Sequence, residues 1–371
     1  MSTAAAPFGT FFLPGPTEVR APVLQAMLAP MLPHRGAAFE TLFAEMQDGL
    51  RAVFRTTRPV YVSSSSATGL MEAAIRAARP GPILALVNGA FSERFAQIAQ
   101  ACGRDTTLLS VPWGTVHDLT LVEAALRARP YSAVTVVQSE TSTGALTTLP
   151  PLATLVHAHG AALLVDSVTG LGGAPVETDA WGLDFVLTGS QKALALPPGL
   201  AFGVASADFI AHAGDSPARG MYFDLVEFEQ YIHKQQTPNT PALSLLYATA
   251  EQMRHIAAET VEARWARHAT MARMTHRWVE TLARDTALPI TVLAPEGHRS
   301  PTVTAIDVPP PLSGDAIVRA VAERGYVIGG GYGKLKGQSF RIGHMGDHTP
   351  DGLARCLDAV TDAISALLRA M

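Results

Sequence analysis

The chain has 371 residues, of which 48% are hydrophobic and 16% are charged, so it can bury the cores of a large domain and a smaller one. Its net charge of −4 provides no basic surface for nucleic acid. No apolar run reaches the roughly 18 residues that a membrane helix needs, and the N-terminus lacks the basic segment of a signal peptide. Cys102 and Cys356 lie far apart and match neither a disulfide framework nor a zinc-ligand pattern. We therefore expect a reduced, cytoplasmic protein that has no metal site.

Proline and glycine punctuate the start of the chain. Pro14-Gly15-Pro16 cannot belong to a helix, and we assign residues 1–16 to an N-terminal arm. Apolar side chains then recur at helical spacing from Phe39 to Phe54. Val60-Tyr61-Val62 is typical of a short buried strand, and a helical pattern resumes at Leu70.

Strand-like and helix-like segments alternate over the next hundred residues. Short apolar runs typical of buried strands cover 82–87, 108–111, 133–137 and 161–165, and helical patterns cover 94–102, 119–128 and 152–159. This alternation predicts a doubly wound α/β domain with a mostly parallel sheet. We assign residues 17–255 to this large domain.

A loop of small hydroxyl residues precedes the helix that begins near Leu70. The loop from Ser63 to Gly69 opens this helix, where unpaired backbone N–H groups and the helix dipole favour an anion. Serine-rich helix starts are also common as simple caps. The loop is therefore a candidate phosphate site that needs support from the rest of the chain.

An acid and an amine follow two neighbouring strand-like runs. Ala161 to Val165 ends in Asp166, and Phe185-Val186-Leu187 leads into Gln191 and Lys192. Parallel strands open onto a ligand at their carboxyl ends, so both side chains are expected at one edge of the sheet. Either charge buried alone would cost several kcal/mol, roughly. A structural ion pair would satisfy both charges, so their spacing alone does not establish a catalytic site.

The last third of the chain predicts a loop, a linking helix and a second domain. Prolines exclude a regular helix from Gln236 to Pro241, and a long helical pattern runs from Leu243 to about Leu282. A strand-like run at 302–308 and helical patterns at 314–324 and 350–371 indicate a small C-terminal α/β domain, which we assign to residues 256–371.

Several of these segments together resemble one enzyme family. The segments are VDSV around Asp166, TGSQKAL around Lys192, PPG at 197–199 and RIGHMG around Arg341. They are similar to the class V aminotransferases, which are fold-type I enzymes dependent on pyridoxal 5′-phosphate, and above all to the alanine–glyoxylate and serine–glyoxylate aminotransferases. The resemblance runs from Pro14 to about Gly346. It implies a seven-stranded, mostly parallel sheet in the large domain.

The resemblance assigns roles to cofactor-binding residues. It implies that Lys192 forms a Schiff base with the cofactor and moves a proton, and that Asp166 pairs with the protonated pyridine nitrogen. It implies that Phe91 stacks on the ring. The residues that would hold the phosphate are Ser66, Ala67, Thr68 and Gln191 and, from the partner subunit of a homodimer, Asn239 and Thr240.

The resemblance also assigns substrate-binding residues. Arg341 would clamp the α-carboxylate through the two-point contact that a guanidinium provides. Ser142 and Thr143 would bond the phenolic oxygen of the cofactor or the substrate carboxylate. Gly15 would let the backbone of the arm approach the substrate. For the donor's side chain, Tyr332, His344, His34 and Arg35 are candidates.

Transamination from alanine, serine or a similar small amino acid to glyoxylate or pyruvate is the function that the resemblance implies. Another donor, aspartate or pyridoxamine, is an open alternative. A lyase of the same fold, such as a cysteine desulfurase, needs a catalytic cysteine and a histidine where Gln191 stands. A nicotinamide dehydrogenase would need glycine where Pro175 stands. A protein that only binds the cofactor would not need both Lys192 and Arg341.

Overall fold

A seven-stranded sheet forms the centre of the larger domain in the computed structural model, which describes residues 8–371. Its strand order is β2-β10-β9-β8-β5-β3-β4, and β10 runs antiparallel to both of its neighbours. The pairs from β9 through β4 are parallel, so the predicted mostly parallel sheet is confirmed. The strands are β2 (Tyr61–Ser63), β3 (Ile83–Val87), β4 (Thr106–Ser110), β5 (Ala133–Val137), β8 (Ala162–Asp166), β9 (Phe185–Gly189) and β10 (Ala201–Ala205).

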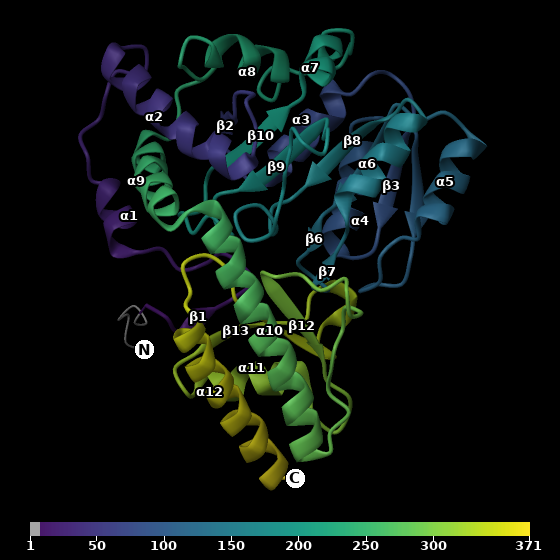
Figure 1. Ribbon diagram of the computed structural model, residues 1–371, viewed down its shortest axis with the longest axis vertical. Coiled ribbons are helices and arrows are strands. Elements are labelled where there is room, and N and C mark those ends of the chain that lie inside the picture. The colour runs from purple at the N-terminus through teal and green to yellow at the C-terminus, as the bar shows by residue number, and fades with distance from the viewer. Residues whose placement is uncertain (1–7) are drawn as a thin grey trace.

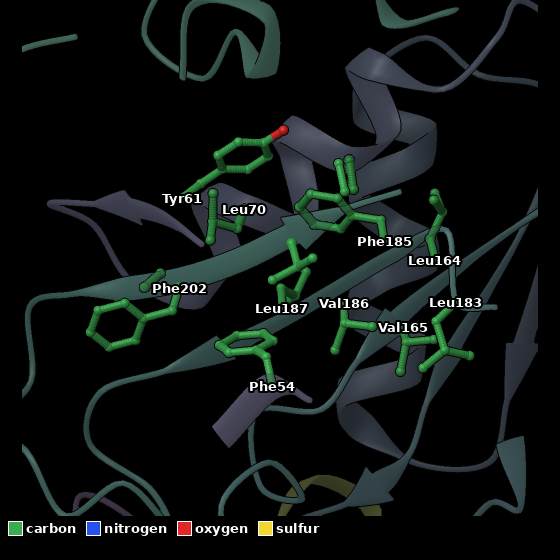
Figure 2. Close-up of a cluster of buried hydrophobic side chains, with 14 of the residues drawn as sticks. Phe54, Tyr61, Leu70, Leu164, Val165, Leu183, Phe185, Val186, Leu187 and Phe202 are labelled. Carbon is green, nitrogen blue, oxygen red and sulfur yellow. The ribbon is translucent and has the colours of Figure 1, made fainter. Parts of the chain in front are cut away.

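Helices cover this sheet, and the central strands are mostly apolar for that reason. Every residue of β3, β5, β9 and β10 is buried, whereas the edge strand β4 alternates between half-buried and exposed residues. Figure 2 shows Val165 of β8 beside Val186 of β9, and Phe54 of α2 below Leu187 of β9 in the same core. Burial of one such side chain contributes about 1.5–3 kcal/mol.

The helices of the large domain follow the predicted order. α3 packs against β9 and β10, α4 packs against β3 and β5, and α6 packs against β8. Figure 1 shows these helices around the sheet in the upper half of the molecule. The helices are α1 (Ala21–Ala26), α2 (Ala37–Phe54), α3 (Ala67–Ala77), α4 (Ala90–Ala101), α5 (Leu119–Ala128), α6 (Leu149–Ala158), α7 (Ala207–Ala213), α8 (Leu225–Ile232) and α9 (Leu243–Glu259).

The smaller domain is a five-stranded sheet with helices packed on it, in the lower half of Figure 1. Its strand order is β1-β13-β14-β12-β11. β1 comes from the N-terminal arm and pairs in parallel with β13, a contact that the sequence did not predict. The elements are β1 (Phe11–Phe12), β11 (Thr291–Val292), β12 (Val303–Asp307), β13 (Val327–Gly330), β14 (Ser339–Gly343), α10 (Val261–Thr286), α11 (Gly314–Ala322), α12 (Pro350–Arg369) and the 3-10 helix η1 (Gly333–Leu335).

The long helical pattern between the domains divides into two helices. α9 ends at Glu259, and α10 begins after Thr260, whose φ of 70° lies in the left-handed region. Ile256 and Val261 belong to the core of the large domain, and Met271 belongs to the core of the small domain. The change of core therefore falls within α10, later than the predicted boundary at 255/256. No helix among residues 8–371 is long and apolar enough to cross a bilayer.

Candidate active site

A cavity of about 250 Å³ lies at the carboxyl edge of the sheet, where β8 ends in Asp166 and β9 leads into Lys192. β8 and β9 pair directly and in parallel, so the sequence placed the acid and the amine correctly at one edge. The cavity is lined by Ser66, Ala67, Thr68, Met71, Phe91, Arg94, Val137, Ser139, Thr141, Asp166, Val168, Gln191 and Lys192.

Asp166 is a buried carboxylate with one oxygen free. Its side chain is buried at 2% exposure, and Oδ1 accepts a hydrogen bond of 2.7 Å from Val168 N. Among residues 8–371, no donor bonds Oδ2. Burial raises the pKa of this carboxyl to about 7, and the nearby Glu140 adds to the rise. The free oxygen is therefore available to a positively charged donor in the cavity.

Lys192 is a buried amine without an acidic partner. The residue is 8% exposed, and Nζ donates to the backbone oxygen of Pro14 in the N-terminal arm. Burial lowers its pKa to about 8, and the positive charge of Arg341 lowers it further. In the part of the chain that the structure describes, Lys192 and Asp166 form no ion pair, so a structural ion pair does not explain them. The amine is held in a state from which it can act as a nucleophile.

The start of α3 forms one wall of the cavity. Ser66 is the N-cap residue, but its side chain makes no capping bond to the helix. Ser66 and Thr68 are exposed, and Ala67 is buried at 6%. Gln191 approaches from the lysine turn, because a Cβ added to Gly189 would lie 2.8 Å from Gln191 Oε1 and 3.5 Å from Ala67 Cβ. Free N–H groups, two hydroxyls and an amide thus converge, as in an anion site.

Glu140 organises the wall that carries Phe91. Its buried carboxylate accepts hydrogen bonds from the first N–H groups of α4, at 3.1 Å from Phe91 N and 2.9 Å from Ser92 N. Its other oxygen lies 2.6 Å from the hydroxyl of Ser142. These bonds place the half-buried Phe91 ring on the cavity wall. The sequence contained Glu140 within a noted motif, but only its burial at a helix N-terminus reveals this positioning role.

The hydroxyl loop contributes a different residue to the cavity than expected. Thr141 lines the cavity, whereas the Ser142 hydroxyl is engaged by Glu140 and accepts a bond of 3.0 Å from Ala90 N. Thr143 is buried, and its hydroxyl caps the backbone N–H of Ala145 at 3.4 Å. The structure thus places neither Ser142 nor Thr143 on the cavity wall. The tight turn between β6 (Ser139–Glu140) and β7 (Ala145–Leu146) decides which hydroxyl faces the cavity, and sequence spacing does not report it.

Arg341 of β14 in the small domain does not line the cavity itself but bonds the backbone of Thr141, which does. Its Nε donates to Gly330 O at 2.8 Å and its Nη1 donates to Thr141 O at 3.1 Å. Within residues 8–371, Nη2 has no hydrogen-bond acceptor and the guanidinium has no carboxylate partner. Burial lowers its pKa to about 10. Arg341 therefore keeps a free donor beside Lys192 and is held at a fixed position by two backbone oxygens.

Comparison with known proteins agrees with this arrangement. Residues 24–331 match the family model described as aminotransferase class-V. The chain is 32% identical over 350 residues to serine–glyoxylate aminotransferase of Methylorubrum extorquens, covering 91% of this chain and 86% of that protein. It is 31% identical over 364 residues to L-aspartate–glyoxylate aminotransferase of Paracoccus denitrificans, covering 96% of this chain and 90% of that protein. This chain belongs to the class V aminotransferases.

A solved structure supports the same family for the fold. Alanine–glyoxylate aminotransferase from Nostoc sp. has a TM-score of 0.90 with this chain at 31% identity, covering 98% of this chain and 97% of that chain. The seven-stranded sheet and the small C-terminal domain are thus the fold-type I architecture of aminotransferases dependent on pyridoxal phosphate.

The cavity of this aminotransferase fits pyridoxal phosphate. The free oxygen of Asp166 can accept a hydrogen bond from a protonated pyridine nitrogen, and the start of α3 can receive the phosphate. Phe91 offers a flat apolar ring for stacking, and Lys192 offers an amine. Neither cysteine lines this cavity, since Cys356 is buried in the core of the small domain and Cys102 follows α4.

Gly15 lies at the lysine, as expected for the arm. Its φ is +114°, a region that favours glycine, and a Cβ there would collide with the Lys192 side chain. Thr17 donates its hydroxyl to Lys192 O at 3.0 Å. The arm of this aminotransferase therefore packs directly on the lysine turn.

The remaining candidates lie outside this chain's cavity. Asn239 and Thr240 are exposed and do not line it. Arg35 donates to Thr237 O at 2.6 Å, and His34 Nε2 is 3.5 Å from the Thr240 hydroxyl, so both support the 236–241 loop. His344 is buried between strands of the small domain, 2.8 Å from the Thr304 hydroxyl, and burial lowers its pKa to about 3.

Sequence reasoning did not assign six residues that line the cavity, which are Met71, Arg94, Val137, Ser139, Thr141 and Val168. Arg94 lines it from the first turns of α4, with its guanidinium 5.1 Å from the Phe91 ring centroid. Val168 lines it two residues after Asp166. Their positions relative to the ends of β3 and β8 were the available signal, because residues just beyond parallel strands face the ligand.

Proposed function

We propose that this aminotransferase moves the amino group of a small amino acid, such as alanine or serine, to an α-keto acid such as glyoxylate. The observation that carries the proposal is the juxtaposition of Lys192, Asp166 and Arg341. A buried amine whose pKa is lowered to about 8 lies with a buried acid in one cavity, and the Arg341 guanidinium bonds the cavity residue Thr141 and is close enough to lower the pKa of Lys192.

Lys192 is the residue we assign to covalent attachment and to proton transfer. When bound, pyridoxal phosphate supplies the carbonyl carbon that exchanges amino groups and a ring that withdraws electrons from the substrate Cα. The lowered pKa keeps a sizeable fraction of the Lys192 amine neutral near pH 8, so it can take a proton from that carbon.

Asp166 would hold the cofactor ring, and Arg341 would hold the substrate carboxylate. Asp166 Oδ2 would hold a proton at the pyridine nitrogen, with Oδ1 fixed by Val168 N. Arg341 would bind the α-carboxylate that amino acids and keto acids share, so one guanidinium serves both halves of the reaction. Ser66, Thr68 and Gln191 would hold the phosphate.

The relatives support glyoxylate more firmly than any one donor. Glyoxylate is named for each of the three related proteins, whereas their named donors are serine, aspartate and alanine. We therefore assign glyoxylate as an acceptor. The choice among donors depends on the residues that contact the donor's side chain.

We also propose a homodimer in which Asn239 and Thr240 complete the phosphate site of the partner. Both are exposed, and with Tyr222 they border a depression beside Ser63 and Ser64, close to the phosphate loop. Large apolar side chains are exposed on the same domain, with Leu28 at 84% and Met221 at 88%, as expected for an uncovered interface. The two unpaired cysteines favour a reducing, cytoplasmic location.

An absorption spectrum with a donor panel tests the proposal. Purified protein should show the visible band of a cofactor bonded to lysine, and Lys192→Ala should lose it while Lys336→Ala, at an exposed lysine, should keep it. Alanine or serine should bleach the band and glyoxylate should restore it. A bound cofactor that never cycles with any pair of amino and keto acids would refute transamination.

A further inference from the structure

We propose that Tyr332 forms the wall of the subsite for the donor's side chain and restricts the donor to small amino acids. The inference rests on the proposed function, because it names the donor class of that same reaction. It is carried by the loop between β13 and β14, whose Tyr332 ring stacks on Phe91 of the cavity wall.

The first part of the loop, with the end of β13, presents a single side chain. Residues 329–333 read Gly-Gly-Gly-Tyr-Gly, so Tyr332 stands alone among glycines. A Cβ at Gly329 would lie 2.7 Å from Pro14 Cδ, and one at Gly333, where φ is +57°, would lie 3.0 Å from Trp113 Cη2. The backbone therefore packs closely on the arm at one end and on the large domain at the other. This packing fixes where the one aromatic ring can lie.

Three active-site residues contact the Tyr332 side chain. Its ring stacks on Phe91 with centroids 5.4 Å apart and an interplanar angle of 18°. The Arg341 guanidinium carbon lies 5.5 Å from the ring centroid. The hydroxyl accepts a hydrogen bond of 3.1 Å from Arg94 Nη2. The ring thus spans the space between the expected carboxylate clamp and the wall of the cofactor cavity.

This position sets the room available to a donor. With its carboxylate on Arg341 and its Cα at Lys192, an amino acid must direct its side chain into the remaining space beside the ring. A methyl or hydroxymethyl group leaves the stack of Tyr332 on Phe91 in place, whereas a longer chain must displace the ring and break its bond to Arg94. Such a wall should lower kcat/KM by about 10- to 200-fold for each methylene added to the donor's side chain.

The experiment compares donors of increasing length in the holoenzyme. L-alanine, L-2-aminobutyrate and L-norvaline are tested with glyoxylate in wild type, Tyr332→Ala and Tyr332→Phe. We expect Tyr332→Ala to raise the ratio of kcat/KM for norvaline over alanine by about tenfold or more. Tyr332→Phe keeps the ring and should change this ratio by less than about threefold, because exclusion depends on ring volume. The cofactor spectrum and melting temperature of each variant check that it is folded and loaded.

A variant in the same loop controls for loop movement. Lys334→Ala removes an ion pair of 2.9 Å with Glu93 but leaves the Tyr332 ring, so the donor ratio should not change. The inference is overturned if Tyr332→Ala lowers activity with all donors equally, if its ratio equals that of wild type, or if Lys334→Ala shifts the ratio as much. A wild type that transaminates no donor would instead overturn the proposed function.

Discussion

Asp166 and Lys192 have shifted pKa values of opposite sign for one reason. Burial raises the pKa of Asp166 to about 7 and lowers that of Lys192 to about 8, because each charged form is costly away from water. Neither has an ion-pair partner among residues 8–371. The site therefore destabilises the cofactor-free fold near pH 7–8, where both groups carry charge, and a cofactor that engaged both groups, as we propose, would relieve this cost. Opposed shifts of this kind in one cavity make the two groups candidates for a functional site.

Asp166→Asn tests this cost through the pH dependence of stability. The folded-state pKa of Asp166 lies above its unfolded value of 3.8, so between about pH 4 and 7 the folded state binds more protons and stability falls as pH rises. Asp166→Asn removes this loss of stability with rising pH, and its side-chain oxygen should still accept the hydrogen bond from Val168 N. The free energy of unfolding of the cofactor-free variant, relative to wild type, should therefore increase from pH 5 to pH 8.

The activity of Asp166→Asn should fall, although its stability relative to wild type increases. Asparagine cannot hold a proton at the pyridine nitrogen, so kcat should fall by about a hundredfold or more. Denaturant unfolding at pH 5, 6.5 and 8 and single-turnover kinetics measure the two effects. A stability difference that is constant across this range would show that the Asp166 pKa is not raised.

At the scale of elements, the sequence predicted the unpaired N–H groups at the start of α3, and only the structure shows that the Ser66 side chain does not cap them. Strands buried on both faces were predictable because their apolar runs are unbroken. By contrast, β1 has two residues, and Thr260 breaks the long helix without changing its apolar periodicity. The positions of Glu140 and Thr141 at the site were not predicted for a related reason. Their roles depend on which way a tight turn aims each side chain, and hydroxyl-rich composition does not encode that direction.

Placing a negative charge at the start of α3 should block the cofactor. Thr68→Glu puts a carboxylate where the free N–H groups would receive the phosphate, so it should raise the dissociation constant of pyridoxal phosphate by about a hundredfold or more, given the strength of charge-assisted bonds. Thr68→Val removes only the hydroxyl and should weaken binding by about tenfold. Inorganic phosphate should slow cofactor loading of wild type and leave Thr68→Glu unaffected. Equal affinity in all three proteins would place the phosphate elsewhere.

At the scale of the whole molecule, a buried network joins both domains to the lysine turn. Arg264 is 1% exposed and donates to Ala193 O at 2.7 Å and to Asp347 Oδ1 at 2.9 Å. Arg20 of the region after the arm bonds the other Asp347 oxygen at 3.0 Å. The backbone that follows Lys192 is thus fixed by α10, by the loop after Arg341 and by the N-terminal region. The two residues proposed to act on the substrate, Lys192 and Arg341, are in this way held by one connected network.

The proposed dimer makes each active site the product of two chains, and subunit complementation tests this directly. Lys192→Ala leaves the 236–241 loop intact, and the double variant Asn239→Ala, Thr240→Ala leaves the lysine intact. A heterodimer of the two has one site with both intact parts and one with neither, so it should have about half the activity of wild type if the sites are shared across a two-fold interface. Each parent homodimer should be much less active, Lys192→Ala most of all.

Coexpression with two affinity tags isolates the heterodimer. If each site were built from one chain alone, the heterodimer would have only the average activity of its parents, and Asn239 and Thr240 would have no role in the partner's site.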